Sequence, residues 1–442
     1  MTEWNTDDLA AQVTGDVTAD DIQRLTELLE ERGTFRYPAL STGLFSAALG
    51  MTGDLAQTGY QNVWVRDNVH VAWGQLLTGR MGVAQRVSAA IMQFYVRHRG
   101  RIADVIEGRT DVDDPMNRPH VRFDGMTLSE LEERWPHAQN DAIGYFLWLY
   151  SGQVERGFLQ PEPEEWATLC DLVHYLKTIE YWQDEDSGHW EEARRISASS
   201  IGTATAGLIA VRRLLDHPES QRRLGVTPRP VDEALLDSLI NQGRETLASI
   251  LPAECIQEDP TKRRAHDAAL LFLIYPLGVV DGDAADKVLA DVLTHLQGDY
   301  GIRRYLGDSY WCADYKALTA ADDRSADFSD RMDERDKLLK PGEEAQWCLF
   351  DPIVSIIYGR EYLRTGDESA RERQRLYLQR SLAQLTDGSG PFEALRCPEA
   401  YYIENGQYVP NDHTPLLWAQ SNLHQALHWM RETLTAAEGS EQ

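Results

Sequence analysis

The feature that most limits the fold of this chain is helical periodicity, which recurs along almost the whole sequence. Thr18 can cap a helix whose apolar residues from Ile22 to Leu29 share one face, and Gly33 can end it. Strand patterns are few and short. Similar helical patterns occur at Val71–Leu77, Ala84–Tyr95, Asp141–Tyr150, Ala167–Ile179, Ser200–Leu215, Ala234–Leu251, Asp267–Tyr275, Ala284–Leu296, Trp347–Leu363, Glu372–Leu385 and Pro415–Leu434.

About a dozen helices fit one closed fold better than several domains. The length of 442 residues by itself would suggest two or three domains, but no low-complexity linker divides the chain. An all-α (α/α)6 barrel contains twelve helices, so we expect one such domain over residues 1–442. We expect the one charge-rich stretch, residues 320–344, to be an exposed loop or short helix within it.

The net charge is −28, from 71 acidic and 43 basic residues. This balance argues against nucleic-acid binding and against anionic membrane surfaces, which both require a positive footprint. The acidic, lysine-poor composition fits either a high-salt cytoplasm or a GC-rich genome. The chain start lacks the regions of a secretory signal, and no apolar run could span a bilayer, so we expect a cytoplasmic protein. Five scattered cysteines predict free thiols.

The motifs of several common enzyme classes do not occur. There is no GxSxG, no P-loop and no GxGxxG after a strand. The histidines do not suggest a zinc site, and we expect His137 and His413 to be structural, hydrogen-bonded residues. The sequence therefore predicts neither a metal nor a cofactor.

Long segments between the predicted helices combine aromatic, acidic and arginine side chains. Long loops on a rigid scaffold are where functional residues usually lie. We therefore expect the site to be built from Tyr60–Asn68, Asp104–Asn140, Gln183–Ser199, Gly301–Tyr315 and Pro391–Thr414.

The segment SGHWEEARR places Glu191 and Glu192 side by side after Trp190, at a corner between two helices. Mutual repulsion and the apolar indole would both raise a carboxyl pKa. A carboxyl that keeps its proton at neutral pH can act as a general acid. The alternative is a solvated turn in which Arg194 and Arg195 neutralise the two acids.

The other segments favour a sugar ligand. In GYQNVWVRDNV, Arg66 and Asp67 follow aromatic residues and could hold vicinal hydroxyls, although they could equally form a surface salt bridge. GIRRYLGDSYW, WPHAQND and RCPEAYYIENG repeat the combination, the last with Glu399 and Glu404. Stacked aromatics, Asp–Arg hydrogen bonding and two separate carboxyls are what a glycoside requires.

Five blocks in order, WVRDN, WPHAQNDA, HWEE, GIRRYLGDSYW and PEAYY…PLLWAQSNL, resemble glycoside hydrolase family 15, the glucoamylases. The closer resemblance is to the branch with the N-terminal domain of phosphorylase kinase α and β subunits and its free-standing bacterial relatives. The blocks run from about Tyr60 to Leu423.

The resemblance implies an (α/α)6 barrel and inverting hydrolysis of α-glucosides from the non-reducing end. It implies Glu191 as the general acid and Glu399 as the general base. Glu393 and Glu404 remain alternatives for the base. Inversion would require about 6.5–9.5 Å between the two carboxyls, to admit a water. The substrate-binding residues that it implies are Trp64, Arg66, Asp67, Trp135, Glu192, Arg304 and Asp308.

Two hypotheses follow. The first is an intracellular inverting hydrolase that releases β-glucose from a small α-glucoside, such as a maltooligosaccharide, isomaltose or trehalose. The second is a non-catalytic glucoside-binding or regulatory module of the phosphorylase kinase type. The two candidate glutamates favour the enzyme, because a pure binder needs no acid–base pair. A phosphorylase would need a phosphate-binding cluster, and we identify none.

Overall fold

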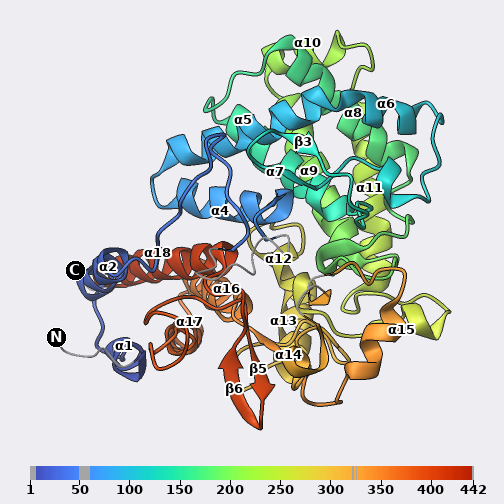
Figure 1. Ribbon diagram of the computed structural model, residues 1–442. Helices are drawn as coiled ribbons and strands as arrows, with labels where there is room; N and C mark the ends of the chain where they lie inside the picture. The colour runs from blue at the N-terminus through green and yellow to red at the C-terminus, as the bar shows by residue number, and fades with distance from the viewer. Residues whose placement is uncertain (1–5, 49–59, 321–322, 325, 441–442) are drawn as a thin grey trace.

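The computed structural model describes residues 6–48, 60–320, 323–324 and 326–440. Twelve of its helices form a double ring (Figure 1). The inner helices, each packed on the next until the last returns to the first, are α4 (Val65–Leu77), α7 (Asn140–Glu155), α9 (Ala198–Leu214), α12 (Leu271–Ile274), α16 (Phe350–Thr365) and α18 (Leu417–Ser440). Their outer partners, in the same order, are α5 (Met81–Arg97), α8 (Pro163–Thr178), α11 (Glu233–Ile250), α13 (Gly282–His295), α17 (Glu368–Ala383) and α2 (Ala19–Glu31).

This arrangement confirms the predicted (α/α)6 barrel, and each predicted helical segment overlaps one ring helix. Thr18 caps α2 as expected, since its hydroxyl accepts from the Asp21 backbone N–H at 3.2 Å while Asp21 accepts from the Thr18 N–H at 3.0 Å. Gly33 follows α2 with a φ of 79°, which favours glycine. The shortest ring helix, α12, is preceded by the 3-10 turn η4 (Ala268–Leu270).

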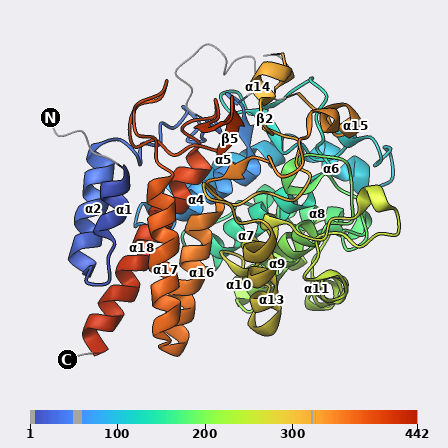
Figure 2. The same ribbon diagram turned by 90° about the horizontal axis from the view of Figure 1, so that it is seen from below.

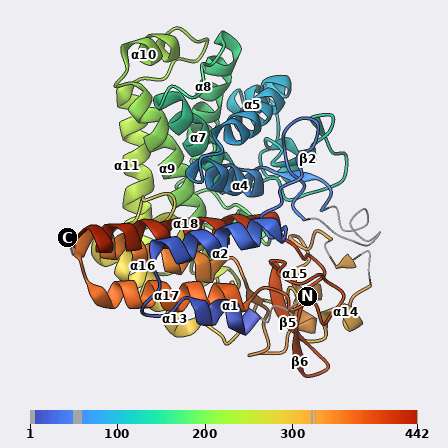
Figure 3. The ribbon, with the colours of Figure 1, turned by 90° about the vertical axis from the view of Figure 1, so that its left-hand side faces the viewer.

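Shorter elements fill the connections. The remaining helices are α1 (Thr6–Gln12), α6 (Arg99–Ile106), α10 (Pro218–Gly225), α14 (Tyr315–Leu318) and α15 (Met332–Arg335). Further 3-10 turns within the described residues are η1 (Pro115–Asn117), η2 (Gly188–Trp190), η3 (Pro260–Lys262) and η6 (Asp336–Leu338). Helices α1 and α2 pack along α17 and α18, so the two ends of the chain share one side of the ring (Figure 3).

Two small antiparallel sheets complete the fold. One has the order β1 (Val63–Trp64), β2 (Arg122–Asp124) and β3 (Ser129–Glu130), and the other has the order β4 (Gln346–Trp347), β5 (Ala400–Glu404) and β6 (Gln407–Pro410). In register, Val63 faces Phe123, and Trp347 faces Ala400. Strands β2 and β5 gather with α14 and α15 at one end of the ring helices (Figure 2).

Glycines allow helices α7 and α9 of the inner ring to pack closely. A Cβ on Gly144 would lie 2.5 Å from the Thr203 carbonyl carbon, and one on Gly207 would lie 2.6 Å from the Gly144 carbonyl oxygen. Both distances are shorter than real contacts, so only glycine allows the two backbones to approach this closely. One connected apolar core includes residues of both α1 and α18. Among the described helices, none is long and apolar enough to cross a bilayer.

The charge-rich stretch differs from its prediction in one respect. Apart from 321, 322 and 325, which lie outside the described residues, it contains α15 and η6, as a short-helix interpretation allows. Arg335 at the end of α15 is only 6% exposed, however, so the stretch is not simply an exposed loop. Its guanidinium donates a hydrogen bond to the buried carboxylate of Glu192.

Candidate active site

A pocket that is partly open to solvent, with about 800 Å³ of space when its open mouth is included, lies at the N-terminal ends of the inner helices. Arg66 and Asp67 come from the first turn of α4, Trp135 precedes α7, and Glu191 precedes α9. Each therefore enters the pocket at, or just before, the N-terminus of an inner helix. The lining residues are Ala47, Tyr60, Trp64, Arg66, Asp67, Trp135, Pro136, His189, Trp190, Glu191, Arg304, Tyr310, Ala326, Asp327, Phe328, Arg335, Trp347, Glu399, Leu416 and Trp418.

Glu191 follows η2 in a left-handed conformation, with a φ of 59°. Its side chain is 18% exposed, and its Oε1 lies 3.4 Å from Arg66 Nη1. Burial raises the pKa of Glu191 to about 7, with repulsion from Asp67 and Asp141 opposing attraction by Arg66 and Arg122. A large fraction of this carboxyl is therefore protonated at neutral pH.

Glu399 lies immediately before β5 and is the opposite case. Its backbone is fixed on both sides, because its N–H donates to the His413 carbonyl and its carbonyl accepts from Cys348. Its Oε1 accepts from the Tyr60 hydroxyl at 2.9 Å, and its Oε2 contacts Asn411 Nδ2 at 2.5 Å and His413 Nδ1 at 2.8 Å. Burial acts to raise the pKa of Glu399, but these partners outweigh burial and lower it, so the carboxylate is ionised.

The two rivals of Glu399 lie away from the pocket. Glu393 is exposed and pairs with Arg396. Glu404, at the end of β5, accepts from the Tyr402 hydroxyl at 2.9 Å. Neither lines the pocket, so the geometry favours Glu399 for the base role.

Arg66 is oriented by a buried polar network. Its Nε donates to Asp141 Oδ2 at 2.8 Å, and its Nη2 donates to Gln139 Oε1 at 2.8 Å and to the Gly188 carbonyl at 3.1 Å. Its neighbour Asp67 has a pKa raised to about 6 by burial and by Glu399, despite the attraction of Arg66. The Arg66–Asp67 pair is thus part of a built pocket rather than a surface salt bridge.

Glu192 does not line the pocket. It is 1% exposed and accepts hydrogen bonds from Arg264 at 2.9 Å, Arg304 at 3.2 Å, Arg335 at 2.5 Å and the Tyr305 hydroxyl at 2.8 Å. Burial acts to raise the pKa of Glu192, but the arginines outweigh burial and lower it. Neither the solvated turn with Arg194 and Arg195 nor a direct contact with a ligand in the pocket matches this placement.

Arg304 lines the pocket, and Asp308, which lies outside the pocket lining, accepts hydrogen bonds from the Arg304 guanidinium. The guanidinium donates to the two Asp308 carboxylate oxygens at 2.6 and 2.7 Å. Its centre lies 4.8–5.0 Å from the ring centroids of Trp347 and Trp190. Asp308 is fully buried and does not line the pocket, so it orients Arg304.

Aromatic rings form the walls. Trp64 and Trp135 meet edge to face with centroids 5.9 Å apart, and Arg122 stacks on Trp135 at 3.9 Å from its centroid. Tyr60 stacks on His413 at 3.7 Å. Such faces suit the apolar sides of a sugar ring.

Some residues at the site were not singled out from the sequence, and two of them, Trp347 and Arg335, line the pocket. Trp347 lay in a predicted helix, and Arg335 lay in the charge-rich stretch. His413 was expected to be structural, and it is hydrogen-bonded, but its partner is the candidate base. No local sequence pattern identifies Trp347 or Arg335, because the pairing of β4 with β5 brings Trp347 to the site and the path of the 320–344 stretch brings Arg335 there.

The family model for glycosyl hydrolases family 15 matches residues 31–422. The chain belongs to this family. Among curated proteins, a probable phosphorylase b kinase regulatory subunit alpha of Caenorhabditis elegans is 27% identical over 402 residues, which are 81% of this chain and 30% of that protein. The chain thus spans about a third of the length of that relative.

Two solved structures share the fold of this chain. A glycosidase in complex with glucose superimposes with a TM-score of 0.64 at 19% identity, covering 95% of this chain and 99% of the other. A bacterial glucoamylase complexed with acarbose gives 0.60 at 14% identity, covering 93% and 56%. At these identities the likeness shows the fold alone, and the family match supports a glycoside hydrolase.

Proposed function

We propose that this protein is an inverting hydrolase that removes β-glucose from the non-reducing end of a small α-glucoside. The proposal is carried by one observation, two carboxyls of opposite pKa shift that line one pocket. Pairs of titratable groups whose environments separate their pKa values mark the acid and the base. Glu191 would protonate the glycosidic oxygen, while ionised Glu399 would deprotonate the attacking water.

The remaining pocket residues supply recognition. Arg66 and Asp67 would bind hydroxyls of the terminal sugar, Trp64 and Trp135 would pack on its faces, and Arg304 would bind nearer the scissile bond. Glu192 and Asp308 would act indirectly, by holding Arg304. Solved structures of this fold carry glucose in one case and acarbose in another, which agrees with a sugar ligand. A cytoplasmic location stays a prediction.

The test is to incubate the protein with maltose, maltotriose, isomaltose and trehalose and to follow the released glucose by proton NMR. Maltose, maltotriose and isomaltose should give an initial excess of β-glucose, whereas trehalose should give equal amounts of the two anomers, because its leaving group is itself α-glucose. Glu191→Gln and Glu399→Gln should each abolish release. Glu404→Gln is a matched control, because Glu404 lies in the same strand region but outside the pocket, and it should retain wild-type turnover. If maltose or isomaltose gives an initial excess of α-glucose, the inverting mechanism is wrong.

A non-catalytic binding module is the second candidate, because the curated relative is named as a regulatory subunit. It predicts that wild type releases no glucose at any salt concentration, while acarbose or glucose still raises its Tm. Asp67→Asn should then remove the Tm shift, which would place the binding in the same pocket.

A further inference from the structure

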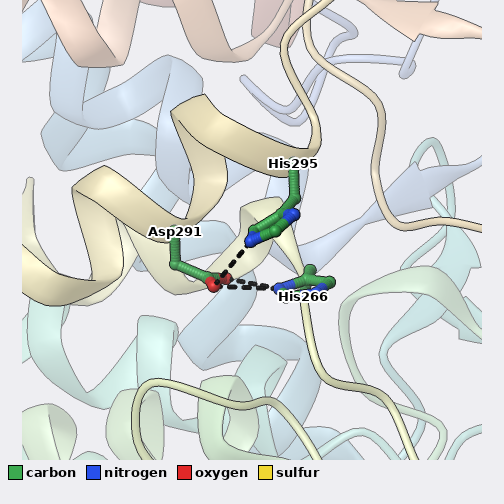
Figure 4. A group of neighbouring side chains, drawn as sticks. All are labelled: His266, Asp291 and His295. Carbon is green, nitrogen blue, oxygen red and sulfur yellow. Dashed lines mark hydrogen bonds and ion pairs between the residues drawn. The ribbon is translucent and has the colours of Figure 1, made fainter.

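Three side chains away from the pocket converge on one point. Asp291 and His295 lie one turn apart on the same face of α13, and His266 reaches them from the segment before η4 (Figure 4). His266 Nδ1 lies 2.8 and 2.9 Å from the Asp291 carboxylate oxygens, and His295 Nε2 lies 3.8 Å from Oδ1. One ligand atom from each residue lies within 4.8 Å of the other two.

We propose that His266, Asp291 and His295 bind a divalent first-row transition metal ion of the Zn²⁺ type. Zinc binds imidazole nitrogen and carboxylate oxygen at about 2.0–2.2 Å in tetrahedral geometry, so its ligand atoms lie about 3.3–3.5 Å apart. The observed separations extend from below to above this range, so binding of the ion would require the side chains to rotate.

The donor set determines the class of ion. Two imidazole nitrogens with one carboxylate favour Zn²⁺, Co²⁺ or Ni²⁺, whereas Mg²⁺ and Ca²⁺ prefer oxygen ligands alone. The side chain of His295 is 44% exposed, so solvent can complete the coordination sphere. All five cysteines are buried, so thiols on the surface do not compete for the ion.

The site is connected to the rear of the catalytic pocket through one residue. Asp267, next to His266, accepts from Trp190 Nε1 at 3.0 Å and from Arg264 Nη1 at 3.0 Å. Trp190 directly precedes Glu191, and Arg264 binds Glu192. A bound ion would fasten this segment to α13, so its role here is to stabilise the fold rather than to carry out chemistry.

The test measures metal binding and stability, which do not depend on the proposed hydrolysis. Chelator-treated wild type should bind one Zn²⁺ per chain in calorimetric titration, and its Tm should rise with Zn²⁺ but not with Mg²⁺. His295→Gln and Asp291→Asn should weaken binding by more than roughly 10–100-fold, the loss that follows even from removal of an outer-shell partner. His217→Gln replaces an exposed histidine elsewhere and should bind as wild type does.

The exposure of His295 means that its substitution should leave the metal-free Tm unchanged, which separates loss of binding from loss of folding. The proposal is overturned by no Zn²⁺ binding in wild type, by equal binding in His295→Gln, or by an equal Tm rise with Mg²⁺. A Co²⁺ titration gives an independent readout, because a visible band that is absent in Asp291→Asn places the ion at these ligands.

Discussion

Glu191 and Glu192 are adjacent in the chain, yet their carboxyls lie in opposite electrostatic surroundings. The left-handed backbone of Glu191, with a φ of 59°, separates the two side chains. Burial acts to raise the pKa of both. It prevails in Glu191, whose pKa rises to about 7, whereas the arginines around Glu192 lower its pKa. Neighbouring charges, rather than burial alone, therefore determine that the pKa of Glu191 is raised and that of Glu192 is lowered.

The first prediction concerns proton donation. Glu191→Gln keeps the size of the side chain but removes the acid, so kcat for maltose should fall by at least roughly 10²–10⁴-fold. A glucoside with a good leaving group needs less protonation, so α-glucosyl fluoride should be affected far less. Glu399→Gln should lose activity on both maltose and α-glucosyl fluoride. Equal losses on maltose and the fluoride in Glu191→Gln would contradict the acid role.

The second prediction concerns the alkaline limb of the pH profile. Turnover requires protonated Glu191, so kcat/KM should decline as pH rises through about 7, the pKa of Glu191. The negative charge of Asp67 helps to raise that pKa. Asp67→Asn should therefore move the alkaline limb to lower pH, whatever it does to the height of the profile. An unmoved limb would show that another group controls it.

The third prediction concerns stability. Glu192→Gln removes the buried carboxylate charge that Arg264, Arg304 and Arg335 share, so it should cost roughly 3–5 kcal/mol in free energy of unfolding. Because the folded-state pKa of Glu192 is lowered, its contribution is present above about pH 4, the unfolded carboxyl value, and is lost as pH falls toward the folded value.

Denaturant titration at several pH values checks both parts of this prediction. Glu192→Gln should show a smaller loss of stability on acidification than wild type. Glu219→Gln, which removes an exposed carboxylate paired with Arg222 and Arg223, is the control and should match wild type. A Glu192→Gln variant as stable as wild type would mean that the cluster contributes no net stability.

The ring could be predicted because its helices carry the signal locally. The capping box of Thr18 and the spacing of Ile22, Leu25 and Leu29 lie within one helix. Helices α6 and α10 were missed, since each has eight residues and few buried ones. Short elements of this kind are fixed by tertiary packing rather than by their own pattern.

The site likewise contains residues that a local sequence pattern reveals and residues whose placement depends on distant parts of the chain. Glu191, Arg66 and Trp135 occur in contiguous blocks, and all three line one pocket. The direction of Glu192 could not be predicted, because it depends on Arg264 and Arg335, which are 72 and 143 positions away. The His266–Asp291–His295 cluster likewise forms only when the chain folds, so the spacing of histidines did not reveal it.

The last prediction concerns the group that tunes the base. The hydroxyl of Tyr60 donates to Glu399 at 2.9 Å, and this bond helps to lower the pKa of Glu399. Burial and the charge of Glu399 raise the pKa of Tyr60 well above its usual value, so the phenol stays a donor. Tyr60→Phe should therefore raise the pKa of Glu399. The acidic limb of kcat/KM should move to higher pH, because the base must be ionised.

Tyr402→Phe is the matched control, since the Tyr402 hydroxyl donates to Glu404 outside the pocket, and the acidic limb of this variant should match that of wild type. A Tyr60→Phe variant with reduced kcat and an unmoved acidic limb would place the effect of Tyr60 on the substrate instead of on Glu399.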